Sequence, residues 1–566
     1  MNRAILLSVI LIVSICLSLP DAVFPADDRS LSEKVSEFIK AQVEENNRGT
    51  GITLAGEPVY TSKMLARFYT KRNFLPAWSE DHGPLGQAET LLKTIKGVNQ
   101  QGLVPEYYHL EAIENLLQLA RSKNRKKFLI EPVMLAELDL LLTDAFLMMG
   151  CHFSVGCVNP VSADADWFAL NSDLEVDRIL EEALKRNRVN EMLLALLPSQ
   201  DDYTKLAQEL AHHREIADSG GWPPVSGGPT LKKGIKDSRV IELRKRLAVT
   251  GDLPLEGKKT GLFFDKELEQ AVLNFQQRHG LKADGAVGPS TLSALNVTAE
   301  ERVRQIQVNM ERTRWISGNL GSRYIRINIA DYRLDAVDNG RTVISMAVVV
   351  GKRYWYTPVF SEKMTYLVLN PYWNVPESIV EEEILPGIRK SPDYLAKHDM
   401  KILSGSWDST EEIDPLSINW DTITGDHFPY RLRQEPGPKN PLGRIKFMFP
   451  NKFNVYLHDT PSKNLFSKNV RAFSHGCIRI EEPMELAEYL MLSDPAWTRE
   501  KIEAEIKNGV EKAVPLPVPI SVHVIYLTAW VDEKSIMQFR DDVYNRDMQL
   551  YEALRKKPAG PRSSLK

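Results

Sequence analysis

The amino-acid sequence predicts a multidomain α+β protein, with a helical N-terminal scaffold, a small three-helix module and a mostly antiparallel β domain. Three observations lead to this fold class. Apolar residues recur at helical spacing from about residue 31 to residue 219. Two glycine- and proline-rich stretches, residues 220–224 and 227–229, then interrupt that pattern and indicate a linker. From Tyr324 onward the hydrophobic period changes from 3.6 to 2, which is the period of a half-buried strand.

Length and composition are those of an ordinary globular chain. Its 566 residues are enough for three or four domains. The contents of 43% hydrophobic and 26% charged residues are typical of soluble domains. The formal net charge of −4 lacks the basic excess of a nucleic-acid-binding protein, so we expect no nucleic-acid partner.

Residues 1–26 have the pattern of an export signal. A single basic residue, Arg3, precedes an apolar run over residues 4–19, and Ala22 and Ala26 are candidate cleavage positions. Neither alanine has a small residue three positions from the cut, so an uncleaved membrane anchor stays open beside a cleaved signal peptide. In either case the body of the protein is exported, and we expect no other contact with the membrane.

Export bears on the cysteines, because disulfides persist in oxidising compartments. Beyond the signal the chain has Cys151, Cys157 and Cys477. The first two could close a small local loop, although spacing alone leaves their pairing open. Cys477 is then the unpaired thiol.

Residues 27–228 are predicted to form the helical scaffold. Phe68, Tyr69 and the aromatic residues of the segment 74–78 gather at a helix end, which is typical of core packing. No paired carboxylates or ligand clusters stand out here, so we assign this region no chemistry. The expected helices cover residues 32–42, 89–98, 110–122, 132–149, 174–186 and 203–216.

Residues 229–299 predict three short helices with clear boundaries. Asp265 is placed as the N-cap of the second helix, Gly280 ends it, Gly285 turns the chain, and Gly288 opens the third helix. This pattern resembles the three-helix peptidoglycan-binding module. The resemblance implies binding of cell-wall glycan or peptide, without chemistry of its own.

A connecting helix at residues 300–319 leads into the β domain, which we place at 320–548 and follow with a tail at 549–566. Asn339 and Gly340 are predicted at the tip of a two-residue hairpin. The β pattern lapses at about residues 376–441, which include the run of Glu381, Glu382 and Glu383. An insertion of this length is often functional, and we interpret it as a lid over a site, with a decorative insertion as the alternative. Further strands are expected at residues 364–370, 446–457 and 520–530.

The residues that can carry chemistry gather before and around Cys477. A cysteine reacts as its thiolate, and a nearby imidazole is the usual means of forming one. His475 and His458 are both available as the base, and spacing does not choose between them. Gly476 lets a substrate carbonyl approach main-chain N–H groups. The alternatives are a buried core thiol and a zinc site made of Cys477, His475 and His458, which lacks a fourth ligand at recognisable spacing.

The β domain resembles the YkuD-type L,D-transpeptidase catalytic family. Four stretches carry the resemblance, namely residues 440–443 (Asn-Pro-Leu-Gly), 456–461 (Tyr-Leu-His-Asp-Thr-Pro), 474–479 (Ser-His-Gly-Cys-Ile-Arg) and 539–542 (Phe-Arg-Asp-Asp). With the scaffold and the wall-binding module before it, the chain is similar to the large periplasmic L,D-transpeptidases of Gram-negative bacteria (the YcbB type).

The resemblance implies a role for each residue of these stretches. Cys477 is expected to be the nucleophile and His458 the proton acceptor, with Asp459 or a main-chain carbonyl orienting the imidazole. The N–H groups of His475, Gly476 and Cys477 are expected to hold the oxyanion. The expected substrate-binding and turn-shaping residues of these stretches are Ser474, Arg479, Tyr456 and Asp459. Trp373 and Asn374, just before the expected lid, are further candidates for lining the cleft, with core packing as the alternative.

The implied reaction joins two peptidoglycan stems without a metal or another cofactor. A tetrapeptide donor would lose D-alanine, Cys477 would hold the acyl group as a thioester, and the side-chain amine of a second stem would form a 3→3 cross-link. The resemblance also implies acylation by carbapenems, and wall synthases are candidate partners. Two alternatives remain: an L,D-carboxypeptidase or hydrolase that uses the same cysteine, and a non-catalytic wall-binding scaffold.

Overall fold

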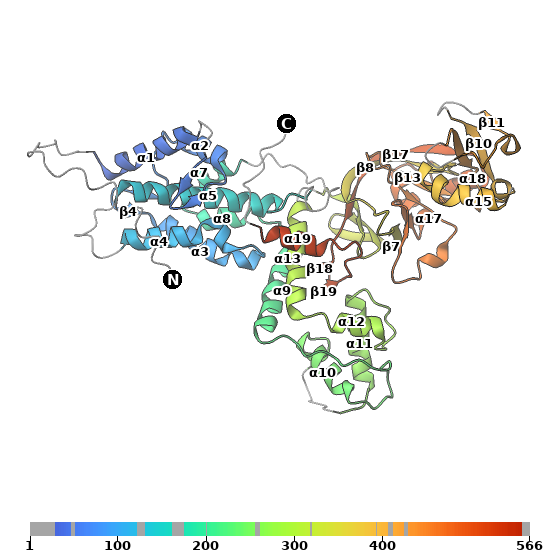
Figure 1. Cartoon of the computed structure of the whole chain (residues 1–566), viewed down its shortest axis with the longest axis horizontal. Helices are drawn as coiled ribbons and strands as arrows, with labels where there is room; N and C mark the ends of the chain where they lie inside the picture. The colour runs from blue at the N-terminus through green and yellow to red at the C-terminus, as the bar shows by residue number, and fades with distance from the viewer. Residues whose placement is uncertain are drawn as a thin grey trace, which may run out of the picture.

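The computed structural model describes residues 29–46, 51–121, 131–160, 175–199, 201–254, 261–316, 320–391, 393–405, 411–423 and 428–556. The expected signal at residues 1–26 lies outside these ranges, within which no helix is long and apolar enough to cross a membrane. The molecule is elongated, with the N-terminal helices at one end and the β domain toward the other (Figure 1). The three-helix module projects to one side from the central part of the molecule. The predicted multidomain α+β class is confirmed.

The N-terminal part is built around one long buried helix, α5. Most of its residues are apolar, and it is buried on nearly all sides by the other helices. Phe68, Tyr69 and Trp78 lie in the same core, as the sequence predicts. The elements of this part are α1 (Leu31–Asn46), β1 (Thr53–Leu54), β2 (Glu57–Pro58), α2 (Ser62–Lys71), β3 (Ser79–Glu80), β4 (Gly83–Pro84), α3 (Gly86–Gly97), η1 (Val98–Gln101), η2 (Pro105–Tyr108), α4 (Leu110–Arg121), α5 (Pro132–Val155), α7 (Val176–Lys185), α8 (Val189–Leu194) and α9 (Asp201–Asp218).

Two aspartates inside α5 attach the surrounding loops to it. The Asp139 carboxylate accepts a hydrogen bond from the Tyr69 hydroxyl at 2.7 Å. Asp144 accepts one from the Thr61 N–H at 2.6 Å and lies 2.8 Å from the His109 Nε2. Burial raises the pKa of Asp139 above its ordinary value. Because a buried carboxylate is tolerated only when hydrogen bonds satisfy it, these contacts fix the loops on α5.

A buried ion pair on α13 (Ala299–Ile316) joins the helical part to the rest of the chain. The side chains of Glu311 and Arg314 are both fully buried and lie 2.8 Å apart. Arg314 also donates to the Tyr203 hydroxyl of α9 at 2.7 Å and to the Gln101 carbonyl at 2.9 Å. Glu311 accepts from the Val158 N–H at 2.7 Å. One pair of charges thus holds α9, α13, η1 and the segment after α5 together.

The three-helix module consists of α10 (Arg239–Val249), α11 (Lys266–Arg278) and α12 (Pro289–Leu295). Asp265 caps α11 by accepting from the Leu268 N–H at 3.0 Å, which confirms the predicted N-cap. Gly280 follows α11 with φ of +64°, as a helix-ending glycine does. The predicted linker is not a free tether, because Trp222 is buried and its Nε1 donates to the Val297 carbonyl at 2.9 Å.

The β domain is a closed barrel. In sheet order its strands are β15-β7-β16-β14-β13-β8-β17-β5-β6, and β6 pairs with β7 to close the ring, while β15 lies along β7. Most pairings are antiparallel, as predicted; β14 with β16, β17 with β5, and β15 with β7 are parallel. The strands are β5 (Arg323–Asn328), β6 (Arg333–Asp338), β7 (Arg341–Gly351), β8 (Phe360–Leu369), β13 (Ile445–Met448), β14 (Leu457–His458), β15 (Ala472–Ser474), β16 (Ile478–Ile480) and β17 (Lys512–Ile525).

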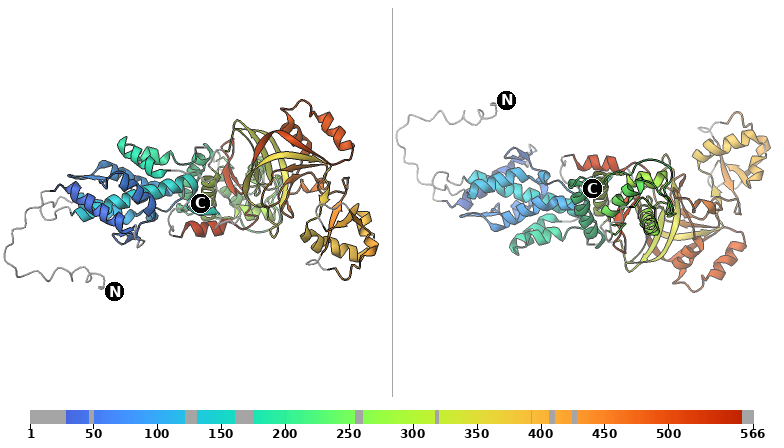
Figure 2. Two further views of the ribbon diagram at one scale, coloured as in Figure 1. Left: turned by 90° about the horizontal axis from the view of Figure 1, so that it is seen from above. Right: turned by 90° about the horizontal axis from the view of Figure 1, so that it is seen from below.

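Several smaller elements surround the barrel. The hairpin of β18 (Ala529–Val531) and β19 (Met537–Phe539) packs against α9 and α13. Seen from above and below, the scaffold, the barrel and the unit formed by residues 373–434 follow one another along the long axis (Figure 2). The remaining helices of this half are η5 (Lys463–Leu465), α17 (Pro483–Met491), α18 (Arg499–Lys507) and α19 (Asp547–Leu554).

The insertion expected at residues 376–441 is a folded unit, which we call the cap (residues 373–434). It has a four-stranded sheet in the order β11-β10-β12-β9 and a hydrophobic core separate from that of the barrel. The cap elements are β9 (Trp373–Asn374), α14 (Glu377–Ile379), the π-helix η3 (Val380–Ile384), α15 (Leu385–Lys390), α16 (Tyr394–Lys397), β10 (Met400–Ser404), β11 (Glu412–Ile413), η4 (Pro415–Ser417) and β12 (Tyr430–Gln434).

The structure differs from the sequence-based expectations in several elements. Helices α2, α8, α17 and α18 were not predicted. The strand expected at residues 446–457 is divided into β13 and β14, because the Asn451 side chain turns the chain by donating to the Phe449 and Val455 carbonyls. The segment expected as a tail from residue 549 begins inside α19, which Arg312 of α13 holds through Asp547 at 2.6 Å.

The disulfide that the spacing left open between Cys151 and Cys157 is absent, and both thiols are free. Cys151 lies on the last turns of α5 and packs against the helical core. Cys157 follows the end of that helix and packs against both the helical core and the barrel core. Burial raises the pKa of Cys151 to about 12, so it is an inert, apolar side chain.

We predict that Gly156→Ala destabilises the junction between the scaffold and the barrel. Gly156 has φ of +87°, and an added Cβ would lie 2.5 Å from the Trp315 Nε1 and 2.6 Å from the Glu311 Oε1. We expect a loss of about 3 kcal/mol in the free energy of unfolding, measured by urea denaturation. The control is Gly220→Ala, where φ is +99° but nothing lies within 4 Å, with an expected loss of about 1 kcal/mol. Equal losses in both variants would contradict the prediction.

Candidate active site

The parallel pairing of β14 with β16 places the candidate residues on one face of the sheet. Leu457 pairs with Ile478, and both point into the barrel core. Because neighbouring residues of a strand point to opposite faces, the next pair, His458 and Arg479, lies on the outer face. Cys477, two residues before Arg479, adjoins the same face. The structure thus brings the nucleophile candidate, one imidazole and one guanidinium together.

A network of hydrogen bonds shapes the turn that carries Cys477. The Ser474 hydroxyl donates to the Cys477 carbonyl at 2.6 Å and accepts from the Gly476 N–H at 3.1 Å. The Thr357 hydroxyl donates to the Gly476 carbonyl at 2.8 Å, and the Tyr544 hydroxyl accepts from the Thr357 N–H at 3.1 Å. Thr357 and Tyr544 were not predicted, because nothing in their local sequence indicates a contact with residues more than 60 positions away.

The same network decides which N–H groups remain for an oxyanion. The Gly476 N–H is taken by the Ser474 hydroxyl. In the part of the chain that the structure describes, the N–H groups of His475 and Cys477 form no hydrogen bond. These two donors can therefore receive an oxyanion without a change in the turn. Gly476 has φ of +112°, so its place in the turn depends on the lack of a Cβ.

The Cys477 thiol is free and protonated in this state. Its Sγ donates a long hydrogen bond, of 3.9 Å, to the Asn454 carbonyl. Burial raises its pKa, against the opposing influence of Tyr456, Lys446 and Arg479. The sequence-based hypothesis requires a thiolate, whereas the surroundings here favour the thiol. The proton must therefore leave during the reaction itself.

His458 is held as a neutral imidazole. Its Nδ1 lies 2.6 Å from the Asp459 carbonyl, which fixes the ring and leaves Nε2 as the nitrogen that can accept a proton. Burial, with further contributions from Arg479 and Lys446, lowers the pKa of His458 to about 3. Among the described residues, no hydrogen bond joins this imidazole to Cys477. A rotation of the cysteine side chain away from Asn454 is needed before the two can exchange a proton.

Of the two groups considered for orienting the imidazole, the main-chain carbonyl of Asp459 makes the contact. The Asp459 carboxylate instead accepts from the Arg444 N–H at 2.9 Å and pairs with Lys463 at 3.0 Å. It packs directly on Gly443, whose φ is +62°. The Asn-Pro-Leu-Gly stretch therefore supports His458 indirectly, through Asp459.

Two cations line the outer face beside the thiol. Lys446 lies opposite His458 in the register of β13 with β14, and its Nζ lies 3.9 Å from the centre of the Tyr456 ring. Arg479 is half-buried, its Nε is buried without a partner, and no ion pair to it exists within the described ranges. Burial lowers the pKa of Arg479 from its ordinary value. A buried guanidinium with no counter-charge is a ready receptor for a carboxylate. Lys446 was not predicted from the sequence.

The cap contacts the turn next to Cys477. The Glu383 Oε1, on η3, lies 3.3 Å from the His475 Nε2. Burial lowers the pKa of His475, and its ring stands edge-on to that of Trp355, with centroids 5.0 Å apart. Trp373 is half-buried against the cap core and Asn374 is exposed in β9, at the base of the cap. Among the described residues, no hydrogen bond or ion pair joins Trp373 or Asn374 to Cys477.

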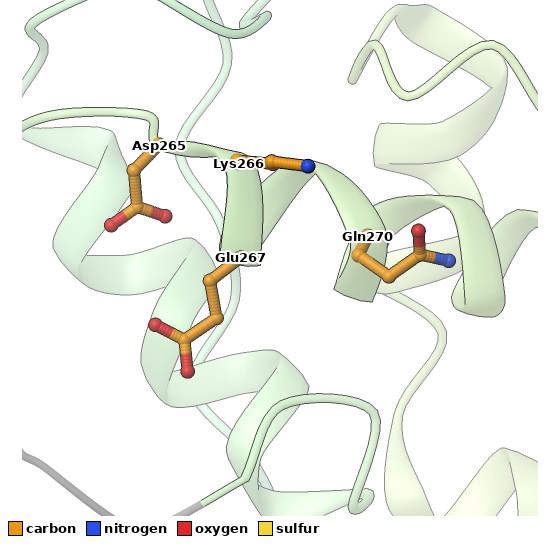
Figure 3. Close-up of a pocket in the computed structure, with 4 residues that line it drawn as sticks. All are labelled: Asp265, Lys266, Glu267 and Gln270. Carbon is orange, nitrogen blue, oxygen red and sulfur yellow. The ribbon is translucent and has the colours of Figure 1, made fainter.

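Two open hollows lie elsewhere. One, of about 890 Å³, is in the scaffold near Arg72 and Glu181. The other, of about 500 Å³, surrounds the first turn of α11 (Figure 3). Asp265 at its rim is already engaged in capping α11 and in pairing with Arg244 at 2.7 Å. Within the described ranges, no cluster of three or more His, Cys, Asp or Glu side chains could hold a metal ion.

We predict that Gly443→Ala disturbs the site without touching a reacting group. An added Cβ would lie 2.3 Å from the Asp459 carboxylate and would displace the residue whose carbonyl orients His458. We expect the reaction of Cys477 with a thiol-specific acylating reagent to slow about tenfold or more, measured by mass spectrometry of the intact protein. Gly509→Ala is the control, since φ is +72° there and nothing lies within 4 Å. An unchanged rate in Gly443→Ala would refute this support role.

Comparison with known proteins identifies three regions of the chain. Residues 63–210 match a family described as "Scaffold domain", residues 236–295 match "Putative peptidoglycan binding domain", and residues 322–499 match "L,D-transpeptidase catalytic domain" (YkuD). A "Putative L,D-transpeptidase" of Haemophilus influenzae is 34% identical over 226 residues, which is 40% of this chain and 45% of that protein.

Two further known proteins match this chain, one over a shorter stretch and one, a solved structure, at lower sequence identity. A "Probable N-acetylmuramoyl-L-alanine amidase" of Bacillus licheniformis is 44% identical over 72 residues, 12% of this chain and 20% of that protein. A solved L,D-transpeptidase structure from Xylanimonas cellulosilytica is 15% identical, covers 53% of this chain and 99% of that chain, and has a TM-score of 0.16. The chain thus covers less than half the length of each of the two curated relatives.

The matched regions follow the observed architecture. The scaffold match falls on the helices around α5, and the peptidoglycan-binding match covers α10 to α12. The catalytic match covers the barrel up to α18, including the cap and the turn with Cys477. The chain therefore carries an L,D-transpeptidase catalytic domain of the YkuD family, preceded by a scaffold domain and a peptidoglycan-binding domain.

Proposed function

We propose that this protein is a periplasmic L,D-transpeptidase that forms 3→3 cross-links in peptidoglycan through a thioester on Cys477. One observation carries the proposal: Cys477, His458 and Arg479 adjoin one outer face of β14 and β16, and the thiol is free. The export signal expected at residues 1–26 and the peptidoglycan-binding domain agree with a substrate in the wall. Neither a metal nor another cofactor takes part in the proposed reaction.

In the first step, the donor tetrapeptide acylates Cys477. The Arg479 guanidinium, whose Nε has no partner among the described residues, binds a stem carboxylate and places the carbonyl of the third residue against Sγ. His458 Nε2 takes the thiol proton as the C–S bond forms, and it passes that proton to the nitrogen of the departing D-alanine. The N–H groups of His475 and Cys477 hold the oxyanion.

In the second step, the side-chain amine of another stem attacks the thioester. A new C–N bond forms, the C–S bond breaks, and the sulfur leaves as a thiolate. The acceptor ammonium loses two protons in total, of which one returns to the sulfur and one goes to solvent. D-alanine takes up one proton from solvent as it leaves, so the complete cycle is balanced. Water can also attack the thioester, and the partition between amine and water distinguishes a transpeptidase from a carboxypeptidase.

We predict that Cys477→Ala loses all activity, because within the described ranges no other free thiol adjoins the site. We expect neither D-alanine release nor cross-linked dimers when the purified variant is incubated with a tetrapeptide muropeptide, with products weighed by mass spectrometry. Cys151→Ala is the control and retains activity, since Cys151 lies in the core of the scaffold. Cross-linking by Cys477→Ala would end the proposal. D-alanine release without dimers from the unaltered protein would make it a carboxypeptidase.

The rate of carbapenem acylation should be nearly constant from pH 8 down to pH 5. The base must be neutral to accept a proton, and the pKa of His458 is lowered to about 3, so it stays neutral in this range. A base of ordinary pKa would be protonated at pH 5 and the rate would fall about 30-fold. Above pH 8 the rate should rise, because the pKa of the Cys477 thiol is raised and the thiolate fraction is still increasing. A steep loss of rate between pH 7 and pH 5 would exclude His458, in this environment, as the base.

A further inference from the structure

The cap presents a carboxylate to the turn that carries the nucleophile. Glu383 stands on η3, a one-turn π-helix, and such turns are rare and occur frequently at functional sites. Its Oε1 lies 3.3 Å from Nε2 of His475, two residues before Cys477. Its negative charge also acts on Arg479. Glu383 belongs to the run of three glutamates noted in the sequence, and these residues have no role in the proposed mechanism.

Apart from Glu383 and its neighbour Glu382, the charged side chains that act on Cys477 and His475 are positive. Lys446 and Arg479 flank the thiol, and Lys352 acts on His475 from the other side. Asp459, which follows His458 in the sequence, pairs with Lys463 at 3.0 Å. An acceptor stem brings its amine as an ammonium at neutral pH, which these cations repel. A negative group is therefore needed where the acceptor enters.

Glu383 is available for that purpose. Its side chain is 52% exposed and has no lysine or arginine within ion-pair distance among the residues that the structure describes. Its one partner there is His475, whose pKa is lowered by burial, so the imidazole is largely neutral at pH 7. The carboxylate thus lacks a full counter-charge, and an ammonium is a better partner than a neutral ring.

We propose that Glu383 binds the ammonium group of the acceptor stem, displacing His475, and so favours aminolysis of the Cys477 thioester over hydrolysis. This inference rests on the proposed transpeptidase function and names the residue that selects its second substrate. The bound ammonium loses one proton to solvent, its nitrogen attacks the thioester carbonyl, and the thiolate that leaves takes the second proton. Glu383 orients the ammonium and is not consumed.

The test is the partition between cross-linked dimer and hydrolysed tripeptide at increasing concentrations of acceptor muropeptide. This ratio is independent of the rate at which the donor acylates Cys477. In Glu383→Gln we expect the acceptor concentration for half-maximal cross-linking to rise about tenfold or more, since a charge-assisted contact is lost. Glu383→Asp should recover a large part of the loss. If Glu383 had only a structural role, its substitution would leave the acceptor concentration for half-maximal cross-linking unchanged.

Glu381→Gln is the matched control. It removes the same charge from the same turn, and Glu381 is exposed and has no ion pair within the described residues. We expect its partition to equal that of the unaltered protein. Equal partition in Glu383→Gln, with cross-linking intact, would overturn the inference and leave the proposed function standing. An unaltered protein that releases D-alanine but forms no dimer at any acceptor concentration would overturn both.

Discussion

The site depends on the parallel register between β14 and β16. These strands are only two and three residues long, and their pairing is fixed by Leu457 and Ile478, which are buried in the barrel core. A slip of β14 by one residue would turn His458 inward and bring Leu457 out, and a slip of β16 would do the same to Arg479 and Ile478. The same hydrophobic burial that stabilises the barrel therefore sets which side chains meet at Cys477. A parallel pair also requires a long connection, and this connection carries the Ser-His-Gly-Cys turn.

Burial governs the electrostatics of the site. It raises the pKa of Cys477 and lowers that of His458, so both groups are neutral in the free protein. A neutral pair costs less to bury than a thiolate and an imidazolium, and it becomes charged only when substrate is present. Arg479 keeps its charge, and its buried Nε has no hydrogen-bond partner in the described part of the chain, so the resting site can still bind a carboxylate. Charge separation is thereby coupled to substrate binding, which limits side reactions of the thiol.

Features set by short stretches of sequence could be predicted, and features set by long-range packing could not. The helix N-cap at Asp265 and the hairpin at Asn339 and Gly340 follow from the conformational preferences of those residues, and both are observed. The role of Thr357 depends on a hydrogen bond to Gly476, more than one hundred positions away, and has no local signature. The cap could be recognised as an insertion from its loss of period. Its own hydrophobic core, and the contact of Glu383 with His475, come from packing that a single sequence does not reveal.

The peptidoglycan-binding domain is held against the barrel by specific contacts, and this bears on how it can serve the site. The Arg540 guanidinium donates to the Arg278 carbonyl at 3.1 Å, and the side chain packs on Gly280, where an added Cβ would lie 2.4 Å from the Arg540 Cδ. The Phe539 ring lies 5.5 Å from that of His279. Because a glycine is required at this junction and the surfaces are packed, the domain has a set orientation with respect to the barrel. A wall strand bound there would meet the catalytic face from a constant direction, whereas a flexible spacer would only raise its local concentration.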